Sequence, residues 1–336
     1  MDSKISVVVQ GQIDKNLTNL CLASLRKYLP KAEIILSTWN GSDVSRLDYD
    51  HVLFNEEPES FFYSSKKDSK LNNINKQIVS TLYGIKKSKR KYVLKLRSDF
   101  LLNGNTFIDF FWRFERQDLD FLLFKHKIIA CSYFCRDPQR SNLAFHPSDI
   151  AFFGLREDLL NLFDVPLMDK REEYYLKNNK GEWINRYLPE QYLFVNFLRK
   201  IGKQPLIIDQ SDIDKNFIEQ TERFFASNFI ILNWKLFNLS PPKKFNNCYK
   251  NDYFSCITFV EWKKLYIKYA CNNCLNLMDY CILIIQDTQR LNLKIKYSYL
   301  FFLKIFAKLI TIPLFGKNNK KLRKIIRDKI ILFCSF

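Results

Sequence analysis

A strand–helix–strand pattern at the start of the chain limits the possible fold more than any other feature. Ile5–Val9 is a nearly continuous apolar run, which is typical of a strand buried on both faces. Apolar residues recur at helical spacing over Asn16–Tyr28, Pro30 ends that helix, and Glu33–Ser37 is a second apolar run. Strands joined in this way run parallel through a right-handed crossover. The pattern therefore predicts an α/β protein with a mostly parallel sheet and flanking helices.

Further elements follow from the same kinds of pattern. Two more strands are expected at His51–Phe54 and Tyr92–Phe100, and Asn72–Asn75 opens a helix between them that runs to about Lys89. Downstream we predict strands at Phe121–Phe124, Ile128–Phe134, Ser148–Gly154 and Pro205–Ile208, and helices at Phe107–Phe114, Arg156–Phe163 and Pro189–Gly202. Pro241–Lys244 predicts a boundary between a domain of residues 1–240 and a helical, basic region of residues 241–336.

The positive charge of the chain is concentrated near its C-terminus. The net charge is +18, and residues 288–336 hold twelve Lys or Arg against one acid, Asp328. Lys304 and Lys308 interrupt the apolar stretch Tyr297–Phe315, which disfavours a helix that spans a membrane. A basic amphipathic segment on an anionic membrane surface fits better, although the charged face of an ordinary packed helix has the same pattern.

Several classes of site lack their sequence signatures. There is no P-loop, no glycine-rich dinucleotide motif, no HExxH and no GxSxG, and only 3 His are present. The charge suits nucleic acid, but no recognition module accompanies it, so no nucleic-acid partner is expected. Met1–Lys4 leads directly into a strand and the 9 Cys are irregularly spaced, which predicts a reduced, cytoplasmic protein without a signal peptide. Cys271–Cys274 is expected to belong to a helix rather than to a zinc site.

Polar residues follow three of the predicted strands at the point where each strand ends. They are Gln10 and Gly11 after the first strand, Thr38 and Trp39 after the second, and Arg97 and Asp99 after the fourth. Because the carboxyl ends of parallel strands meet at one edge of a sheet, these residues are expected to converge. An aromatic ring, an amide and a carboxylate at that edge could hold a base, a ribose and a metal-bound diphosphate. Trp39 either stacks on the base or packs in the core.

These strand ends belong to a set of short motifs that resembles the WavE family of lipopolysaccharide-synthesis proteins. The motifs follow in the family's order over roughly the first 230 residues, and the last hundred or so residues carry none of them. They are Val9–Gly11, Ile35–Trp39, Asn72–Thr81, Lys95–Asp99, His146–Asp149 and Pro189–Tyr192. The resemblance implies a GT-A-like, Rossmann-type fold. It also implies transfer of a sugar from a nucleotide-sugar donor to a lipid-linked or polysaccharide acceptor of a lipopolysaccharide or other surface glycan.

In this resemblance Arg97-Ser98-Asp99 occupies the place of the Asp-x-Asp motif of GT-A enzymes. Asp99 is then the candidate ligand of a Mg²⁺ or Mn²⁺ ion that bridges the donor diphosphate, because such ions prefer oxygen ligands. Arg97 stands where the first Asp of the motif is expected. A single carboxylate binds a divalent ion weakly, and a guanidinium group can hold a diphosphate by itself. The need for a metal therefore stays open.

The resemblance suggests roles for further residues, each with a structural alternative. Glu190 is the candidate general base, kept ionised by the start of its helix, or it only stabilises that helix start. Asp149, with His146 beside it, is the rival base or binds the acceptor hydroxyl. Asn75 binds the nucleotide or caps its helix. Lys95 reaches a phosphate or points to solvent.

Two functions from different classes follow from these features. The main hypothesis is a glycosyltransferase held by its basic tail on the inner face of the cytoplasmic membrane, where a lipid-linked acceptor resides. The alternative is a non-catalytic peripheral membrane or assembly protein that keeps the fold without the activity. The single carboxylate of the Arg97–Asp99 motif leaves room for that alternative.

Overall fold

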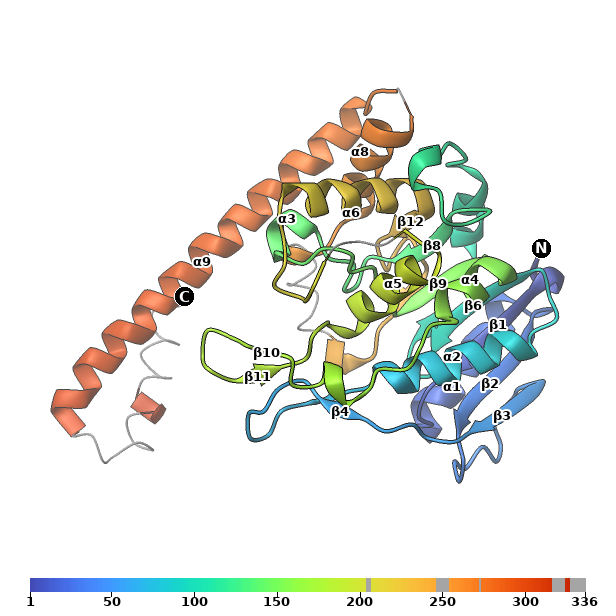
Figure 1. Ribbon diagram of the computed structural model, residues 1–336, viewed down its shortest axis with the longest axis horizontal. Helices are drawn as coiled ribbons and strands as arrows, with labels where there is room; N and C mark the ends of the chain where they lie inside the picture. The colour runs from blue at the N-terminus through green and yellow to red at the C-terminus, as the bar shows by residue number, and fades with distance from the viewer. Residues whose placement is uncertain (204–206, 246–253, 272, 316–323, 327–336) are drawn as a thin grey trace. The chain divides into compact units, whose positions relative to one another are not determined.

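The computed structural model of the chain describes residues 1–203, 207–245, 254–271, 273–315 and 324–326. Its centre is a seven-stranded sheet with the order β12-β8-β9-β6-β1-β2-β3 (Figure 1). All of these strands run in the same direction except β9, which is antiparallel to both β6 and β8. The strands are β1 (Ile5–Gln10), β2 (Glu33–Trp39), β3 (His51–Asn55), β6 (Tyr92–Arg97), β8 (Ile128–Cys131), β9 (Ala151–Leu155) and β12 (Phe229–Leu232). The predicted α/β fold with a mostly parallel sheet and flanking helices is confirmed, and it is consistent with a GT-A-like fold.

The sheet is buried between helices, as its apolar strands require. Every residue of β1 and β2 is buried. Helices α2 (Ile74–Lys87), α4 (Arg156–Phe163) and α5 (Pro189–Lys200) pack against one another, and α2 also packs on β1 and β2. Gly84 lets α2 approach closely, because a Cβ atom there would collide with the side chain of Val8. Helix α1 (Lys15–Tyr28) belongs to the β1–β2 crossover, which the right-handed rule places on the opposite face.

The order of the strands creates a switch point between β1 and β6. From β1 the chain proceeds to β2 and β3 on one side, and it then returns through α2 to place β6 on the other side. Gln10, at the end of β1, pairs in register with Ser37 of β2 and with Arg97 of β6. Ligands of open α/β sheets bind outside the carboxyl ends of the strands at such a point.

Shorter elements surround the sheet and complete the first unit. Three two-stranded pairs are β4 (Phe61–Phe62) with β5 (Leu71–Asn72), β7 (Leu101–Leu102) with β13 (Leu239–Ser240), and β10 (Leu176–Lys177) with β11 (Trp183–Ile184). The remaining helices of this part are α3 (Pro138–Ser141), α6 (Lys215–Asn228) and α8 (Phe259–Ala270). Short 3-10 turns are η1 (Asp2–Lys4), η2 (Thr106–Trp112), η3 (Leu119–Phe121), η4 (Lys170–Glu172) and η5 (Lys243–Phe245).

Some local predictions are wrong, and side-chain contacts explain the clearest case. The strand predicted at Phe121–Phe124 is absent, because the Asn228 side chain bonds the backbone of Phe121 and Leu123 in place of a neighbouring strand. The helix predicted at Phe107–Phe114 is the 3-10 turn η2. Residues 271 and 273–274 are not helical, since α8 ends at Ala270. Residues 207–208 form no strand, and residues 204–206 lie outside the described residues.

The chain divides into two compact units, Met1–Leu275 and Asn276–Phe336. The boundary predicted after residue 240 falls inside the first unit, where α8 packs against α6 and β12. The described part of the second unit consists mainly of α9 (Leu277–Phe315). None of the described helices combines the length and apolar character needed to traverse a bilayer. Most of the basic cluster predicted at Lys317–Lys329 lies outside the described residues.

Candidate functional site

A cleft of about 450 Å³ opens at the switch point between β1 and β6. Its volume lies in the range that is usual for small-molecule sites. The lining comes from the ends of β1, β2 and β6, the segment after β3, the starts of α1 and α2, and one residue of η5. These residues are Gln10, Gly11, Gln12, Ile13, Asp14, Leu17, Trp39, Glu57, Asn73, Lys76, Gln77, Arg97, Ser98, Asp99 and Lys244.

The backbone at the end of β1 is shaped by a glycine and two hydroxyl groups. Gly11 has a φ of +117°, a conformation that residues with a side chain rarely adopt, and this lets the chain turn along the cleft. Ser98 donates a hydrogen bond of 2.7 Å to the carbonyl of Gln12, which ties the turn after β6 to the turn after β1. Ser80 of α2 donates 2.8 Å to Oε1 of Gln10. The floor of the cleft is therefore held before any ligand arrives.

Asp99 is fully engaged by two cations on the cleft wall. Arg97 binds it through two parallel hydrogen bonds, Nε to Oδ1 at 3.0 Å and Nη2 to Oδ2 at 2.9 Å. The ammonium group of Lys244 lies 2.5 Å from Oδ2. Burial raises the pKa of Asp99, but the hydrogen bond from Arg97 and the charges of Arg97 and Lys244 outweigh this and leave the pKa below its ordinary value. Asp99 is therefore held as a carboxylate with its charge compensated.

The residues present do not fit a divalent cation well. Both oxygens of Asp99 already accept hydrogen bonds from cations, which would repel a metal ion. Within the described part of the chain, no group of three or more His, Cys, Asp or Glu side chains is arranged to hold a metal. The other two acids of the cleft lining are also engaged, since Glu57 is paired with Lys76 and Asp14 accepts hydrogen bonds from the N–H groups of Asn16 and Leu17. The donor set around Arg97 matches an anion instead, and the predicted Mg²⁺ or Mn²⁺ site stays an untested prediction.

The electrostatics of the cleft favour phosphate. Arg97, Lys76 and Lys244 line it, and Arg97 is held between two rings, 5.8 Å from the centre of Phe100 and 5.4 Å from that of Phe245. The first turn of α2 also borders the cleft, and its N-cap residue Asn73 makes no side-chain capping hydrogen bond, so this helix start favours a negative charge. The start of α1 is already capped, because Asp14 accepts hydrogen bonds from the N–H groups of Asn16 and Leu17. A fixed guanidinium fork, two ammonium groups and one helix start suit a ligand with a charged diphosphate.

A second, buried group of charges lies next to the cleft, on the α2 side of the sheet. Lys95 is fully buried, and its ammonium group donates to the backbone carbonyl of Asp149. Burial lowers the pKa of Lys95 to about 8, although the charge of Asp149 acts in the opposite direction. The charges of Asp149 and Glu190 also raise the pKa of Arg97, so the two groups of charges interact. Lys95 points to this interior cluster rather than to solvent.

Burial also changes the pKa of Glu190. Burial, and secondly the charge of Asp149, raise its pKa to about 8. Its Oε2 lies 3.4 Å from Nε2 of His146, whose own pKa is lowered to about 3, first by burial and then by Arg136. Nδ1 of His146 lies 3.0 Å from the carbonyl of Phe134 and must donate to it, so Nε2 is an acceptor. Both shifts favour the neutral forms of the two side chains, and the expectation that the helix start lowers the pKa of Glu190 is wrong, because burial and Asp149 raise it.

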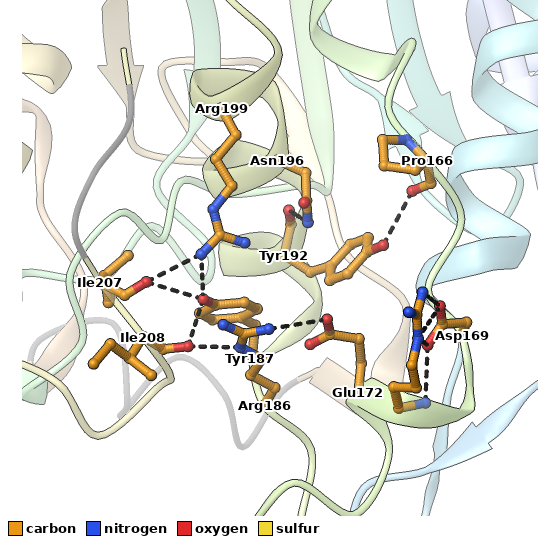
Figure 2. A network of polar contacts seen from close by, with 11 residues as sticks. Pro166, Asp169, Glu172, Arg186, Tyr187, Tyr192, Asn196, Arg199, Ile207 and Ile208 are labelled. Atoms are coloured by element: carbon orange, nitrogen blue, oxygen red, sulfur yellow. Dashed lines mark hydrogen bonds and ion pairs between the residues drawn. The ribbon is translucent and has the colours of Figure 1, made fainter. Parts of the chain in front are cut away.

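The helix that carries Glu190 is anchored by a polar network at its two ends (Figure 2). Arg199, in the last turn of α5, donates to the hydroxyl of Tyr187 at 2.7 Å and to the carbonyl of Ile207 at 3.1 Å. Tyr187 in turn donates to the carbonyls of Ile207 and Ile208. Since Tyr187 directly precedes the helix start at Leu188, this network fixes the segment that presents Glu190.

The structure sorts the predicted site residues into three sets. Gln10, Gly11, Trp39, Arg97 and Asp99 line the cleft. Lys95, Asp149 and Glu190 meet in the buried cluster. Thr38 and Asn75 join neither set: Thr38 is buried with its hydroxyl 3.1 Å from that of Ser42, and the amide of Asn75 bonds both backbone groups of Met168. The chemical roles proposed for all these residues stay predictions.

Three residues that the sequence analysis did not single out complete the site. Lys76 lies one residue after Asn75 on α2, so its position in a helix start was the available signal. Lys244 reaches Asp99 from a segment far along the chain, and no sequence pattern connects the two. Tyr63 lies within the electrostatic reach of Glu190 and Asp149, and burial followed by those charges raises its pKa. Only tertiary folding brings Lys244 and Tyr63 to the site.

An open α/β sheet with a cleft at its switch point places this protein in the class of α/β proteins that bind small-molecule ligands at the carboxyl ends of their strands. The comparison with protein families is more specific. The model of the family described as WavE lipopolysaccharide synthesis matches residues 5–294 of the 336-residue chain. The chain therefore belongs to the WavE lipopolysaccharide-synthesis family. No match was found among curated proteins.

Proposed function

We propose that this protein is a glycosyltransferase of lipopolysaccharide synthesis that takes its sugar from a nucleotide-sugar donor. The observation that carries the proposal is the Arg97–Lys244 cation pair at the switch point of the sheet, inside a cleft of small-molecule size. Arg97 and Lys244 would bind the diphosphate of the donor, and Trp39 and Gln10 line the side available to its nucleoside. Family membership supports a sugar donor and a glycan acceptor in general.

In the proposed reaction an acceptor hydroxyl displaces the diphosphate directly. A bond forms between the hydroxyl oxygen and the anomeric carbon of the donor sugar. The bond between that carbon and the diphosphate oxygen breaks, and its electron pair leaves with the nucleoside diphosphate, where Arg97 and Lys244 would stabilise the new charge. The hydroxyl proton passes to the ionised carboxylate of Glu190, which the neutral Nε2 of His146 would then help to hold as a carboxyl. Asp149 is the alternative base.

Calorimetry with a panel of nucleotide-sugars, in Mn²⁺ and in EDTA, tests this proposal together with its metal dependence. We expect one donor to bind in both buffers, because protein cations already compensate the diphosphate. Asp99→Asn is expected to tighten donor binding by about threefold to tenfold, since it removes a competing carboxylate from Arg97 and Lys244. If Asp99 were instead the metal ligand, the Asn variant would bind the donor more weakly and its Mn²⁺ response would vanish.

The same measurement separates the two function classes. Binding of no nucleotide-sugar in either buffer would favour the non-catalytic peripheral or assembly protein. Asn161→Asp is a useful control, because Asn161 is an exposed residue of α4 and lies outside the cleft lining. This variant introduces a charge without touching the cations of the cleft, so its donor affinity should equal that of the wild-type protein.

We further propose that α9 holds the protein on the anionic inner face of the cytoplasmic membrane. Apolar side chains that are more than half exposed recur along this helix: Leu277, Met278, Ile284, Ile285, Leu291, Ile295, Phe301, Phe302, Phe306 and Leu309. Such side chains gain free energy on entering the interfacial region of a bilayer, and basic residues add attraction to anionic lipid. This position would bring the active site to a lipid-linked acceptor.

Flotation with vesicles tests the membrane proposal. Replacing Phe301 and Phe302 with Ser is expected to lower the partition onto phosphatidylglycerol vesicles by about tenfold or more, since two exposed rings no longer enter the interface. Leu119→Ser is the matched control, because Leu119 is 79% exposed but lies in the first unit. Equal binding of the wild-type protein to phosphatidylcholine and phosphatidylglycerol would contradict the electrostatic part, and unchanged binding of the double variant would contradict the role of α9.

A further inference from the structure

Two hairpins that are far apart in the sequence join beside the candidate site. The first is β4–β5 with its connecting loop (residues 61–72), and the second is β10–β11 with its loop and the two residues before it (residues 174–184). The labels of β4, β10 and β11 lie close together in Figure 1. Ser64 pairs with Ile184, the N–H of Ser65 donates 2.8 Å to the carbonyl of Trp183, and the N–H of Trp183 donates 2.9 Å to Oγ of Ser65. We call this combined element the double hairpin.

The double hairpin is connected to both parts of the site. Glu57 and Asn73, on either side of the first hairpin, line the cleft. The second hairpin runs directly into α5, which presents Glu190 in its first turn. Tyr63 faces inward and interacts with the charges of Glu190 and Asp149. The double hairpin therefore adjoins both the proposed donor cleft and the proposed base, where the acceptor must approach.

The outer surface of the double hairpin is rich in exposed aromatic side chains. Phe62 is 45%, Tyr174 43%, Tyr175 38% and Trp183 42% exposed. In a strand, alternate residues project to the same side, so Phe62 points outward while its neighbour Tyr63 is directed to the interior cluster. Trp183 stands directly opposite Lys177, whose ammonium group lies 5.0 Å from the centre of its ring. Polar side chains accompany these rings along the chain: Glu173 accepts a hydrogen bond from the N–H of Phe62, and Asn178 donates one to Glu182.

This composition suits a carbohydrate better than an anionic membrane. A sugar ring presents a face of C–H groups, which packs on the negative face of an aromatic ring, and an edge of hydroxyls, which amides and carboxylates can bind. Residues 58–72 and 173–186 together contain six basic and four acidic residues, a mixed charge unlike the twelve-to-one excess of residues 288–336. A surface that binds acidic lipid needs a net excess of cations.

We propose that the double hairpin is the binding platform for the acceptor glycan, with Trp183 and Tyr174 as its main stacking rings. This inference rests on the proposed glycosyltransferase function and adds to it the place and the chemistry of acceptor recognition. The acceptor sugar would lie against the outer rings with its reacting hydroxyl directed toward Glu190. The lipid part of a lipid-linked acceptor would not contact the double hairpin.

The test measures glycan binding and donor binding separately on the full-length protein. The probe is an array of lipid-free core and O-antigen oligosaccharides from bacterial lipopolysaccharides. Replacing Trp183 and Tyr174 with Ala is expected to weaken binding of the captured oligosaccharide by about tenfold to a hundredfold, and Trp183→Phe should retain most of the affinity. Tyr83→Ala is the matched control, because Tyr83 is 50% exposed with Lys86 5.5 Å from its ring, on α2.

The outcomes test the acceptor-binding platform and the proposed glycosyltransferase function separately. Calorimetric donor binding and slow donor hydrolysis by water should be unchanged in the double variant, because neither ring lines the cleft. Unchanged glycan binding in that variant, or no glycan binding by the wild-type protein, would overturn the platform even if the donor binds. Loss of phosphatidylglycerol-vesicle binding in the same variant, with no effect on glycans, would show a membrane contact instead. Absence of donor binding would overturn the proposed glycosyltransferase function. The glycan-binding measurement could still be interpreted, because it does not depend on the donor.

Discussion

Glu190→Gln is expected to lower turnover by about a hundredfold to ten thousandfold, the usual effect of removing a general base. Donor affinity should change little, because Glu190 does not line the cleft. In the wild-type protein the rate should rise with pH up to about 8, since the pKa of Glu190 is raised to about 8 and only its ionised form accepts a proton. The residual rate of the Gln variant should lose this dependence. Single-turnover rates from pH 5.5 to 9 provide the measurement.

Asp149→Asn decides between the two candidate bases. If Asp149 is the base, its Asn variant shows the larger loss of turnover and Glu190→Gln keeps most of the activity. Among the described residues, the charged or titratable groups that interact with Glu190 are Asp149, Lys95, Arg97, Arg136, His146 and Tyr63. Of these, Lys95 has a pKa lowered to about 8 by burial, so loss of its proton is expected to limit the rate at the alkaline end of the profile.

The pH dependence of the melting temperature distinguishes a chemical role of Glu190 from a structural one. The ordinary pKa of a glutamate is 4.5, and the folded-state value is raised to about 8, so the folded protein binds this proton more tightly than the unfolded chain does. Glu190 therefore costs stability increasingly as the pH rises from about 4.5 to about 8. The Gln variant should have a higher melting temperature than the wild-type protein at pH 8 and a similar one near pH 4.5. A variant that is less stable at every pH would indicate a structural role.

Arg97→Gln is expected to weaken binding of the nucleoside diphosphate by about tenfold to a hundredfold, because a charge-assisted hydrogen bond contributes about 1.5–3 kcal/mol. Arg97→Lys should recover only part of the affinity, since an ammonium group lacks the planar fork. Binding of the nucleoside without phosphates should be unaffected. Titration calorimetry at two salt concentrations measures both effects, and the salt dependence should fall with the loss of the cation.

Arg171→Gln is a closely matched control for this variant. Arg171 forms the same type of two-residue pair with Asp169, with Nε 3.0 Å from Oδ2, but it is 90% exposed and lies outside the cleft lining. Its loss should leave donor affinity unchanged. Equal weakening by both substitutions would mean that general charge, rather than the cleft, governs donor binding.

The sequence by itself determined the sheet and the residues at its edge. Apolar runs such as Ile5–Val9 and helical spacing such as that of Asn16–Tyr28 are local patterns, and the direction of parallel strands then brings their ends together. Gln10, Trp39 and Arg97 were therefore predictable as neighbours. Where a side chain from elsewhere replaces a local partner, as Asn228 does at Phe121 and Leu123, local prediction failed.

Only the tertiary structure decided the electrostatics of the site. Lys244 compensates Asp99 from a distant segment, so both oxygens of the single carboxylate in Arg97-Ser98-Asp99 are already paired with protein cations. Burial, and then the charge of Asp149, raise the pKa of Glu190 against the influence of its helix start. Charge compensation and desolvation depend on distances and on access of water, and neither quantity is encoded in the spacing of residues along a chain.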